Sequence, residues 1–152
     1  MFSLFKKKPL LDKETQQKVE AAIQQAESGT TGEIRVYIES HCKTADPMER
    51  AREVFAALEM FKTEARNAVL VYVATADRKF ALFGDQAIYE QAGGPAFWQA
   101  AADKLTGHLR KNELGNGLAD CILTLGSALA AQFPAGPGKN DNELSDEIVF
   151  GK

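Results

Sequence analysis

The chain is poor in the residues that build disulfide frameworks and metal centres. Its 152 residues include two cysteines and two histidines. Two cysteines are too few for the disulfide framework of a small secreted domain, so we expect reduced thiols. Cys42 directly follows His41, but no CxxC pair accompanies them, and a zinc site needs further ligands at fixed spacing. A structural zinc site is therefore not expected.

A strong net charge and long apolar runs are also missing. The formal net charge is −3, from 18 basic and 21 acidic side chains that are mixed along the chain. This mildly acidic mixture argues against nucleic acid as a partner. No apolar run approaches the roughly 20 residues of a membrane helix, so no transmembrane segment is expected. We predict a single cytoplasmic domain.

The first eleven residues, MFSLFKKKPLL, alternate apolar and basic stretches. They lack the long apolar core and the small-residue cleavage site of a secretory signal. We predict a flexible basic N-terminus over residues 1–11. Two interpretations stay open: a segment without a role of its own, and a weak membrane-surface contact through Phe2, Leu4 and Phe5 with the lysines that follow.

Residues 12–134 carry the helical and strand patterns of a packed domain. Strand patterns cover residues 33–39, 69–73 and 80–83, and helical patterns cover residues 13–27, 47–61, 86–92, 95–109 and 117–133. Asp12, Asp46 and Asp85 stand where helix caps are expected, and Phe61 closes the apolar stripe of the second helix. Residues 135–152 form a polar tail in which Ile148 to Phe150 could dock on the domain or on a partner.

The order of these elements predicts the sheet. A strand, a helix and a strand in succession imply a parallel pair with a right-handed crossover. The short link from Thr75 to Arg78 makes the third strand antiparallel to the second. We therefore predict a three-layer α/β/α sandwich, with about five helices around a small mixed sheet that combines a parallel pair with an antiparallel hairpin strand.

Carboxylates at one edge of this sheet are candidate metal ligands. Glu39 and Asp46 follow the first strand, and Asp77 lies in the hairpin turn after the second. The carboxyl ends of parallel strands share an edge, and ligands of open α/β sheets bind there. Carboxylate oxygens suit a hard cation such as Ca²⁺. The sequence therefore predicts a divalent-cation site built from Glu39, Asp46 and Asp77.

Each of these residues also has an ordinary structural interpretation, which stays open at this point. Asp46 is placed as the cap of the helix that begins at Pro47. Asp77 and Arg78 fit a polar turn, and Glu39 fits an exposed strand position.

Sequence signatures of common catalytic sites are absent. The chain has no GxSxG elbow, no P-loop and no HExxH motif. The cysteine-phosphatase pattern needs an arginine six positions after the cysteine, and here Met48 stands six positions after Cys42. The residues themselves therefore name no reaction and favour binding over catalysis.

The segment NAVLVYVATADRKFALFGDQAI, from Asn67 to Ile88, resembles the TPM domain family. That family includes thylakoid-lumen phosphatase-like proteins, photosystem repair factors and a levamisole-receptor-associated protein. Its TG-E-I start matches Thr31 to Ile34, its N-x-V-L-L-x-V-A-x-x-D-R-K motif matches Asn67 to Lys79, and its later Gly-Leu matches Gly117-Leu118. The end of the chain, NELSDEIVFGK, is similar to short stand-alone bacterial members.

The resemblance implies an α/β/α sandwich, Ca²⁺ bound by the loops of one sheet edge, and a weak acid-phosphatase activity. In that chemistry Asp77 would hold the cation and Arg78 would contact the phosphate. The alternative is a non-catalytic interaction module with a membrane-associated protein as its partner.

Overall fold

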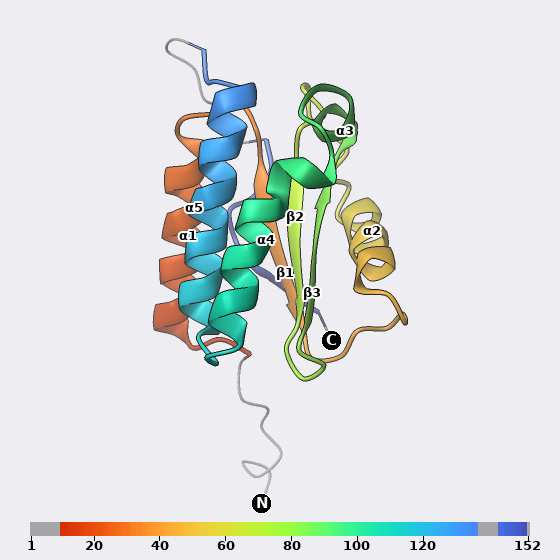
Figure 1. The fold of residues 1–152 in the computed structure, drawn as a ribbon, viewed down its shortest axis with the longest axis vertical. Coiled ribbons are helices and arrows are strands. Elements are labelled where there is room, and N and C mark those ends of the chain that lie inside the picture. Colours follow the sequence, from red (N-terminus) through yellow and green to blue (C-terminus); the bar gives the residue numbers. More distant parts are fainter. Residues whose placement is uncertain (1–9, 137–142, 152) are drawn as a thin grey trace, which may run out of the picture.

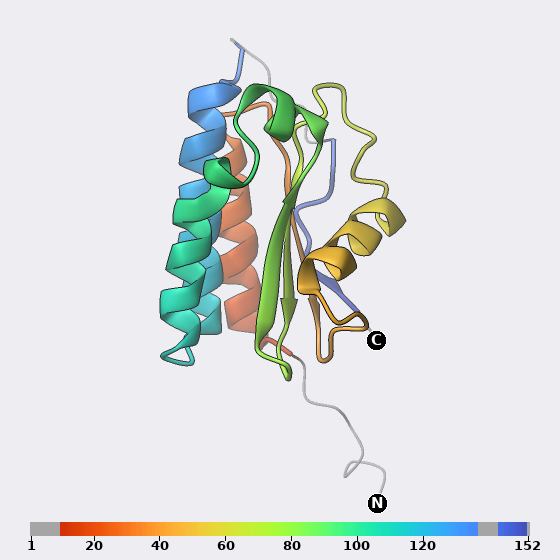
Figure 2. The same cartoon turned by 45° about the vertical axis from the view of Figure 1, so that its right-hand side comes forward.

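The computed structural model describes residues 10–136 and 143–151, which form three layers (Figures 1 and 2). The elements in chain order are α1 (Lys13–Glu27), β1 (Ile34–Glu39), α2 (Pro47–Ala57), β2 (Val69–Ala74), β3 (Lys79–Gly84), α3 (Gln86–Gln91), α4 (Pro95–Leu109), α5 (Leu114–Gln132) and β4 (Val149–Phe150). This architecture confirms the predicted α/β/α sandwich.

The sheet has the strand order β3-β2-β1-β4. β1 and β2 are parallel, with Ile34 opposite Val69 and Glu39 opposite Ala74. β3 runs antiparallel to β2, as the short link predicts. All six residues of β2 are buried, which is typical of a central strand covered on both faces. The predicted parallel pair and hairpin are therefore confirmed.

The two faces of the sheet are covered unequally. α1, α4 and α5 pack on one face, whereas α2 lies on the other (Figure 2). Alternation along the strands divides the side chains, because successive residues point to opposite faces. Ile34 and Val36 thus join the larger core, and Leu70 and Tyr72 join the smaller core beneath α2.

The predicted caps start three helices. The side chains of Asp12, Asp46 and Asp85 accept hydrogen bonds from backbone N–H groups of the first turns of α1, α2 and α3. The prediction for the far end of the second helix was wrong. α2 ends at Ala57, and the Phe61 side chain is 39% exposed instead of buried. A left-handed residue at Glu59 turns the chain away before the apolar stripe is complete.

A membrane-spanning helix was not expected, yet α5 is long and apolar enough to cross a membrane by length and composition. Its buried side chains, among them Leu118, Ile122 and Leu125, belong to the larger core. The core helix of a packed domain passes the same test, so the apolar character of α5 follows from its position between α1 and α4. The predicted membrane-contacting residues Phe2 to Lys8 lie outside the described residues.

The end of the chain adds a fourth strand that the sequence analysis missed. Val149 and Phe150 pair in parallel with Tyr37 and Ile38 of β1. Ile148 is buried in the larger core. Residues 143–151, here called the C-terminal segment, therefore cover the edge of β1 instead of forming only a polar tail (Figure 1).

Buried carboxyl groups hold the C-terminal segment. The Leu144 N–H donates to Glu33 Oε1 at 2.9 Å, and the Ile34 N–H donates to Glu27 Oε2 at 2.7 Å. Burial, together with the nearby Asp146 and Glu33 carboxylates, raises the pKa of Glu27 to about 9. Burial likewise raises the pKa of Glu33 to about 7. The folded protein therefore favours the neutral form of both groups.

This arrangement predicts a stability that falls as the pH rises above 4.5. Because both pKa values are raised on folding, the stabilisation is complete below pH 4.5 and is lost as the pH rises through about 7 and then about 9. Glu27→Gln has no charge to bury, so its free energy of unfolding should exceed that of the wild type by on the order of 1 kcal/mol at pH 9. Urea unfolding from pH 5 to 9 measures this, with the exposed Glu90→Gln as control. A wild-type stability that does not change over this range would contradict it.

α1 and α5 make a close backbone contact at Gly126. A Cβ added there would lie 2.6 Å from Ala26 Cβ and 2.8 Å from Ala26 Cα, whereas a Cβ at Gly107 of α4 would meet nothing within 4 Å. Gly126→Ala should therefore destabilise the fold by about 1–3 kcal/mol through overpacking. Gly107→Ala should stabilise it by about 0.5–1 kcal/mol through helix propensity. Equal midpoints for the two variants in thermal unfolding would refute this contact.

Candidate functional site

Two connections meet at the carboxyl ends of β1 and β2. They are the loop of residues 40–46 and the turn of residues 75–78, here together called the loop edge. The parallel register places them side by side: the Thr75 N–H donates to the Glu39 carbonyl and the Ala76 N–H donates to the Ser40 carbonyl, each at 2.8 Å. The polar residues that the sequence analysis assigned to this edge therefore do lie at one end of the sheet.

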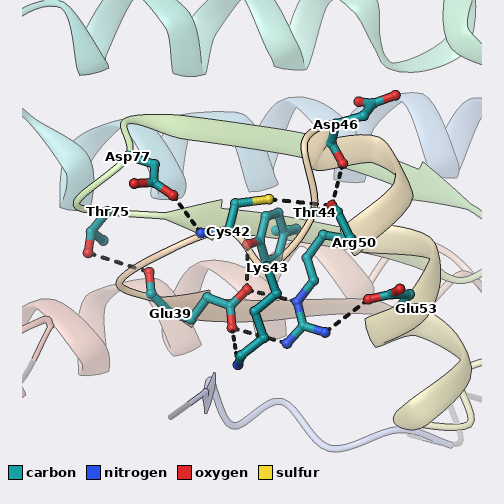
Figure 3. Close-up of polar contacts among 10 residues, drawn as sticks. Glu39, Cys42, Lys43, Thr44, Asp46, Arg50, Glu53, Thr75 and Asp77 are labelled. Carbon is teal, nitrogen blue, oxygen red and sulfur yellow. Dashed lines mark hydrogen bonds and ion pairs between the residues drawn. The ribbon is translucent and has the colours of Figure 1, made fainter.

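Asp77 joins the two connections. Its Oδ2 accepts the Cys42 N–H at 2.6 Å, and its Oδ1 lies 3.0 Å from His41 Nδ1 (Figure 3 shows the contact with Cys42). Hydrogen bonds from His41 and the Cys42 N–H lower the pKa of Asp77, so the carboxylate is charged at neutral pH. The side chain is 28% exposed, and that of His41 is 75% exposed. Asp77 thus combines a structural role with access to solvent.

Glu39 is buried and fully engaged. Arg50 binds its carboxylate with Nε at 2.9 Å and Nη2 at 3.1 Å, and Lys43 Nζ lies 3.1 Å away. The Tyr72 hydroxyl donates to Glu39 Oε2. Burial alone would raise the pKa of Glu39, but the hydrogen bonds from Arg50, Tyr72 and Lys43 lower it to about 2. The exposed strand position considered for Glu39 is wrong, because its side chain is only 1% exposed.

Tyr72 links this carboxylate to the Cys42 thiol. Burial, followed by the hydrogen bond to Glu39, raises the pKa of the Tyr72 hydroxyl, which therefore stays a donor. The Cys42 Sγ lies 3.7 Å from Thr44 Oγ1. Burial opposes ionisation of the thiol, but hydrogen bonds with the Thr44 backbone, Tyr72 and the Thr44 side chain lower its pKa. Cys42 is thus the more acidic thiol of the chain, whereas burial raises the pKa of Cys121 to about 12.

Asp46 lies apart from the other two predicted ligands (Figure 3). Its Oδ1 accepts the Met48 N–H at 3.0 Å, which is the cap contact that the sequence predicts. Among residues 10–136 and 143–151, no group of three or more His, Cys, Asp or Glu side chains is arranged to hold a metal ion. The structure therefore brings Glu39, Asp46 and Asp77 to one edge but does not converge their carboxylates.

Arg78 points to the opposite side of the turn from Asp77. Its Nη2 donates to Asn112 Oδ1 at 2.5 Å, which ties the hairpin turn to the connection between α4 and α5. Both residues have left-handed backbones, with φ of 54° at Arg78 and 57° at Asn112. The predicted contact of Arg78 with a phosphate stays a prediction.

Sequence reasoning missed most partners at this edge. The sequence analysis did not single out Lys43 or Arg50, and Tyr72 was only part of the strand pattern of residues 69–73. One signal was available for Arg50: a helix that begins at Pro47 places it one turn later, facing back to the end of β1. Asn112 carried no such signal, because its contact depends on how the helical layer sits against the hairpin.

The arrangement defines a small α/β/α domain with a polar loop edge at the carboxyl ends of its parallel strands. Residues 5–128 match the family model of the TPM domain, and the chain belongs to that family. The family match ends within α5, so the C-terminal segment lies beyond it.

Solved structures agree with this assignment. The NMR structure of the BA42 protein from the psychrophilic bacterium Bizionia argentinensis is 33% identical, with a TM-score of 0.88 over 97% of this chain and 99% of that chain. The N-terminal domain of the cg2496 protein from Corynebacterium glutamicum is 15% identical, with a TM-score of 0.66 over 90% of this chain and 84% of that one, and it shares the fold. No curated protein matches the chain.

The buried Glu39 contacts predict a strong effect on stability. Glu39→Gln leaves Arg50 without its buried charged partner, so we expect a loss of about 3 kcal/mol in the free energy of unfolding. Glu53→Gln removes an exposed partner of the same arginine and should cost less than about 0.5 kcal/mol. Urea unfolding at pH 7 compares the two variants. Equal losses would show that the Glu39 contacts do not stabilise the fold.

Proposed function

We propose that this chain is a non-hydrolytic binding module that takes a divalent cation such as Ca²⁺ at the loop edge, with Asp77 as the principal ligand. The Asp77 carboxylate supports this proposal most. It is charged and partly exposed, and from the turn of residues 75–78 it binds the loop of residues 40–46. In the described part of the chain it makes no ion pair with a lysine or an arginine.

The neighbours of Asp77 are compatible with a bound cation. The His41 side chain is 75% exposed, so its ring can turn away without leaving a packed position. Carbonyl groups of residues 40–46 and water would supply the remaining oxygen ligands, since Ca²⁺ takes about 6–8. Glu39 contributes little in this proposal, because Arg50 and Lys43 already neutralise its charge. We therefore expect weak affinity, with a dissociation constant on the order of 1 mM.

Phosphate-ester hydrolysis is not part of the proposal. A general base works best with a pKa near the working pH, whereas the pKa of Glu39 is about 2 and that of Asp77 is lowered. The alternative of a non-catalytic module with a membrane-associated protein partner needs no cation. The two binding proposals differ in one measurable property, the response of the loop edge to Ca²⁺.

A Ca²⁺ titration of the metal-stripped protein, followed by backbone amide NMR with Mg²⁺ for comparison, tests the proposal. We expect saturable shifts at residues 41–46 and 75–79. Asp77→Asn should abolish them, because the amide cannot replace the charge. Asp103→Asn, an isosteric change on the exposed face of α4, should leave them unchanged.

Two outcomes would contradict the proposal. Amide shifts that change linearly with Ca²⁺ concentration up to about 10 mM in a folded protein would show no specific cation site and would favour the protein-interaction alternative. Steady hydrolysis of phenyl phosphate that is lost in Asp77→Asn would show that the edge is catalytic.

A further inference from the structure

A pocket lies on the side of the hairpin turn that faces away from Asp77. Its volume is about 160 Å³, and it opens between the β2–β3 turn and the α4–α5 connection. Val73, Leu109 and Leu114 provide apolar walls, while Arg78, Lys79 and Asn112 provide the polar ones. A cavity of about 150 Å³ is large enough to hold a benzene ring. The pocket is therefore of the right size for one small ring.

The charged residues that line the pocket have one sign. Among the described residues, the charged ones in its lining are Arg78 and Lys79, without a carboxylate. The neighbouring Asp77 is held on the other side of the turn by Cys42 and His41. Lys79 Nζ lies 3.4 Å from the Ala45 carbonyl, so its ammonium group leans toward the loop edge. Arg78 is thus the charged residue best placed to bind an anion in this pocket.

One hydrogen bond orients the guanidinium group of Arg78. Its Nη2 donates to Asn112 Oδ1 in the connection between α4 and α5. A guanidinium group has five N–H donors in a planar fork that matches the two oxygens of a carboxylate or phosphonate. The bond to Asn112 uses one donor and orients the others. An arginine oriented in this way loses less entropy when it binds an anion.

From these observations we propose that the pocket binds small amphipathic anions, with an oxyanion head group on Arg78 and a ring-sized apolar body against Val73, Leu109 and Leu114. This inference goes beyond the cation proposed at Asp77. It concerns a ligand of opposite charge on the other side of the turn, and it does not require a bound metal.

Amide NMR with four probes tests the inference in the presence of EDTA: benzoate, phenylphosphonate, inorganic phosphate and benzyl alcohol. Benzoate or phenylphosphonate should shift residues 73–79 and 109–114 in a saturable manner, with a dissociation constant on the order of 1 mM. Whichever of the two binds more tightly identifies the head group. Inorganic phosphate lacks the apolar body and benzyl alcohol lacks the charge, so each should bind about tenfold more weakly.

Matched variants locate the site. Arg78→Gln should weaken binding of the anionic ring compounds about tenfold, whereas the same change at the exposed Arg110 should have no effect. Leu114→Phe should fill the pocket and abolish binding, while the remaining amide spectrum reports that the fold is intact. Binding of the anionic ring compounds should be the same with and without EDTA, so this result is separable from that of the Ca²⁺ titration.

Three outcomes would overturn the inference. Absence of saturable shifts for both anionic ring compounds would show that the pocket is not a binding site for them. Equal weakening by Arg78→Gln and Arg110→Gln would indicate only general surface charge. Equal affinity for benzyl alcohol would indicate an apolar cleft in which Arg78 has no part.

Discussion

The parallel pairing of β1 with β2 is the constraint on which the rest of the structure depends. It places the loop of residues 40–46 beside the turn of residues 75–78, because both follow parallel strands that end at the same level. It also requires the α2 crossover, which brings Arg50 back over the end of β1. The polar side chains that could bind a ligand thus meet at one edge as a consequence of topology.

The hairpin turn connects both helical layers to the sheet. Asp77 holds the loop that leads into α2, and Arg78 holds the connection between α4 and α5. Adjacent residues of one turn therefore contact opposite layers, and the backbone between them includes the left-handed Arg78. This division separates the Asp77 carboxylate at the loop edge from the pocket that Arg78 lines on the far side of the turn. A ligand at either site would contact the residues that fasten the layers together.

Local patterns were sufficient to predict most of the fold. The apolar run from Val69 to Val73 predicted the second strand, and the Asp46-Pro47 pair predicted the start of α2. The C-terminal strand was missed, because a two-residue strand has no period of its own and is held by side chains as distant as Glu33. The sequence analysis also assigned Phe61 to the apolar stripe of the second helix, because no local pattern showed that α2 ends at Ala57.

The candidate site was less predictable than the fold. The edge that carries Glu39, Asp46 and Asp77 followed from strand order. Whether each carboxylate is paired or available could not be predicted, because this depends on residues that the fold brings from elsewhere in the chain. Arg50 and Tyr72, for example, form hydrogen bonds with the Glu39 carboxylate. Sequence spacing alone cannot distinguish a buried, paired carboxylate from an available one. The buried cluster around Glu27 escaped prediction for the same reason, since its covering segment lies more than a hundred residues away in the chain.

The central claim is that Asp77 holds the two connections of the loop edge together. Hydrogen exchange of the Cys42 amide tests it most directly, because that N–H donates to Asp77 Oδ2 and to no strand partner. We expect slow exchange in the wild type, acceleration of at least about tenfold in Asp77→Ala, and unchanged exchange at Val71 in the centre of β2. Exchange of the wild-type Cys42 amide as fast as that of a free loop amide would contradict the account.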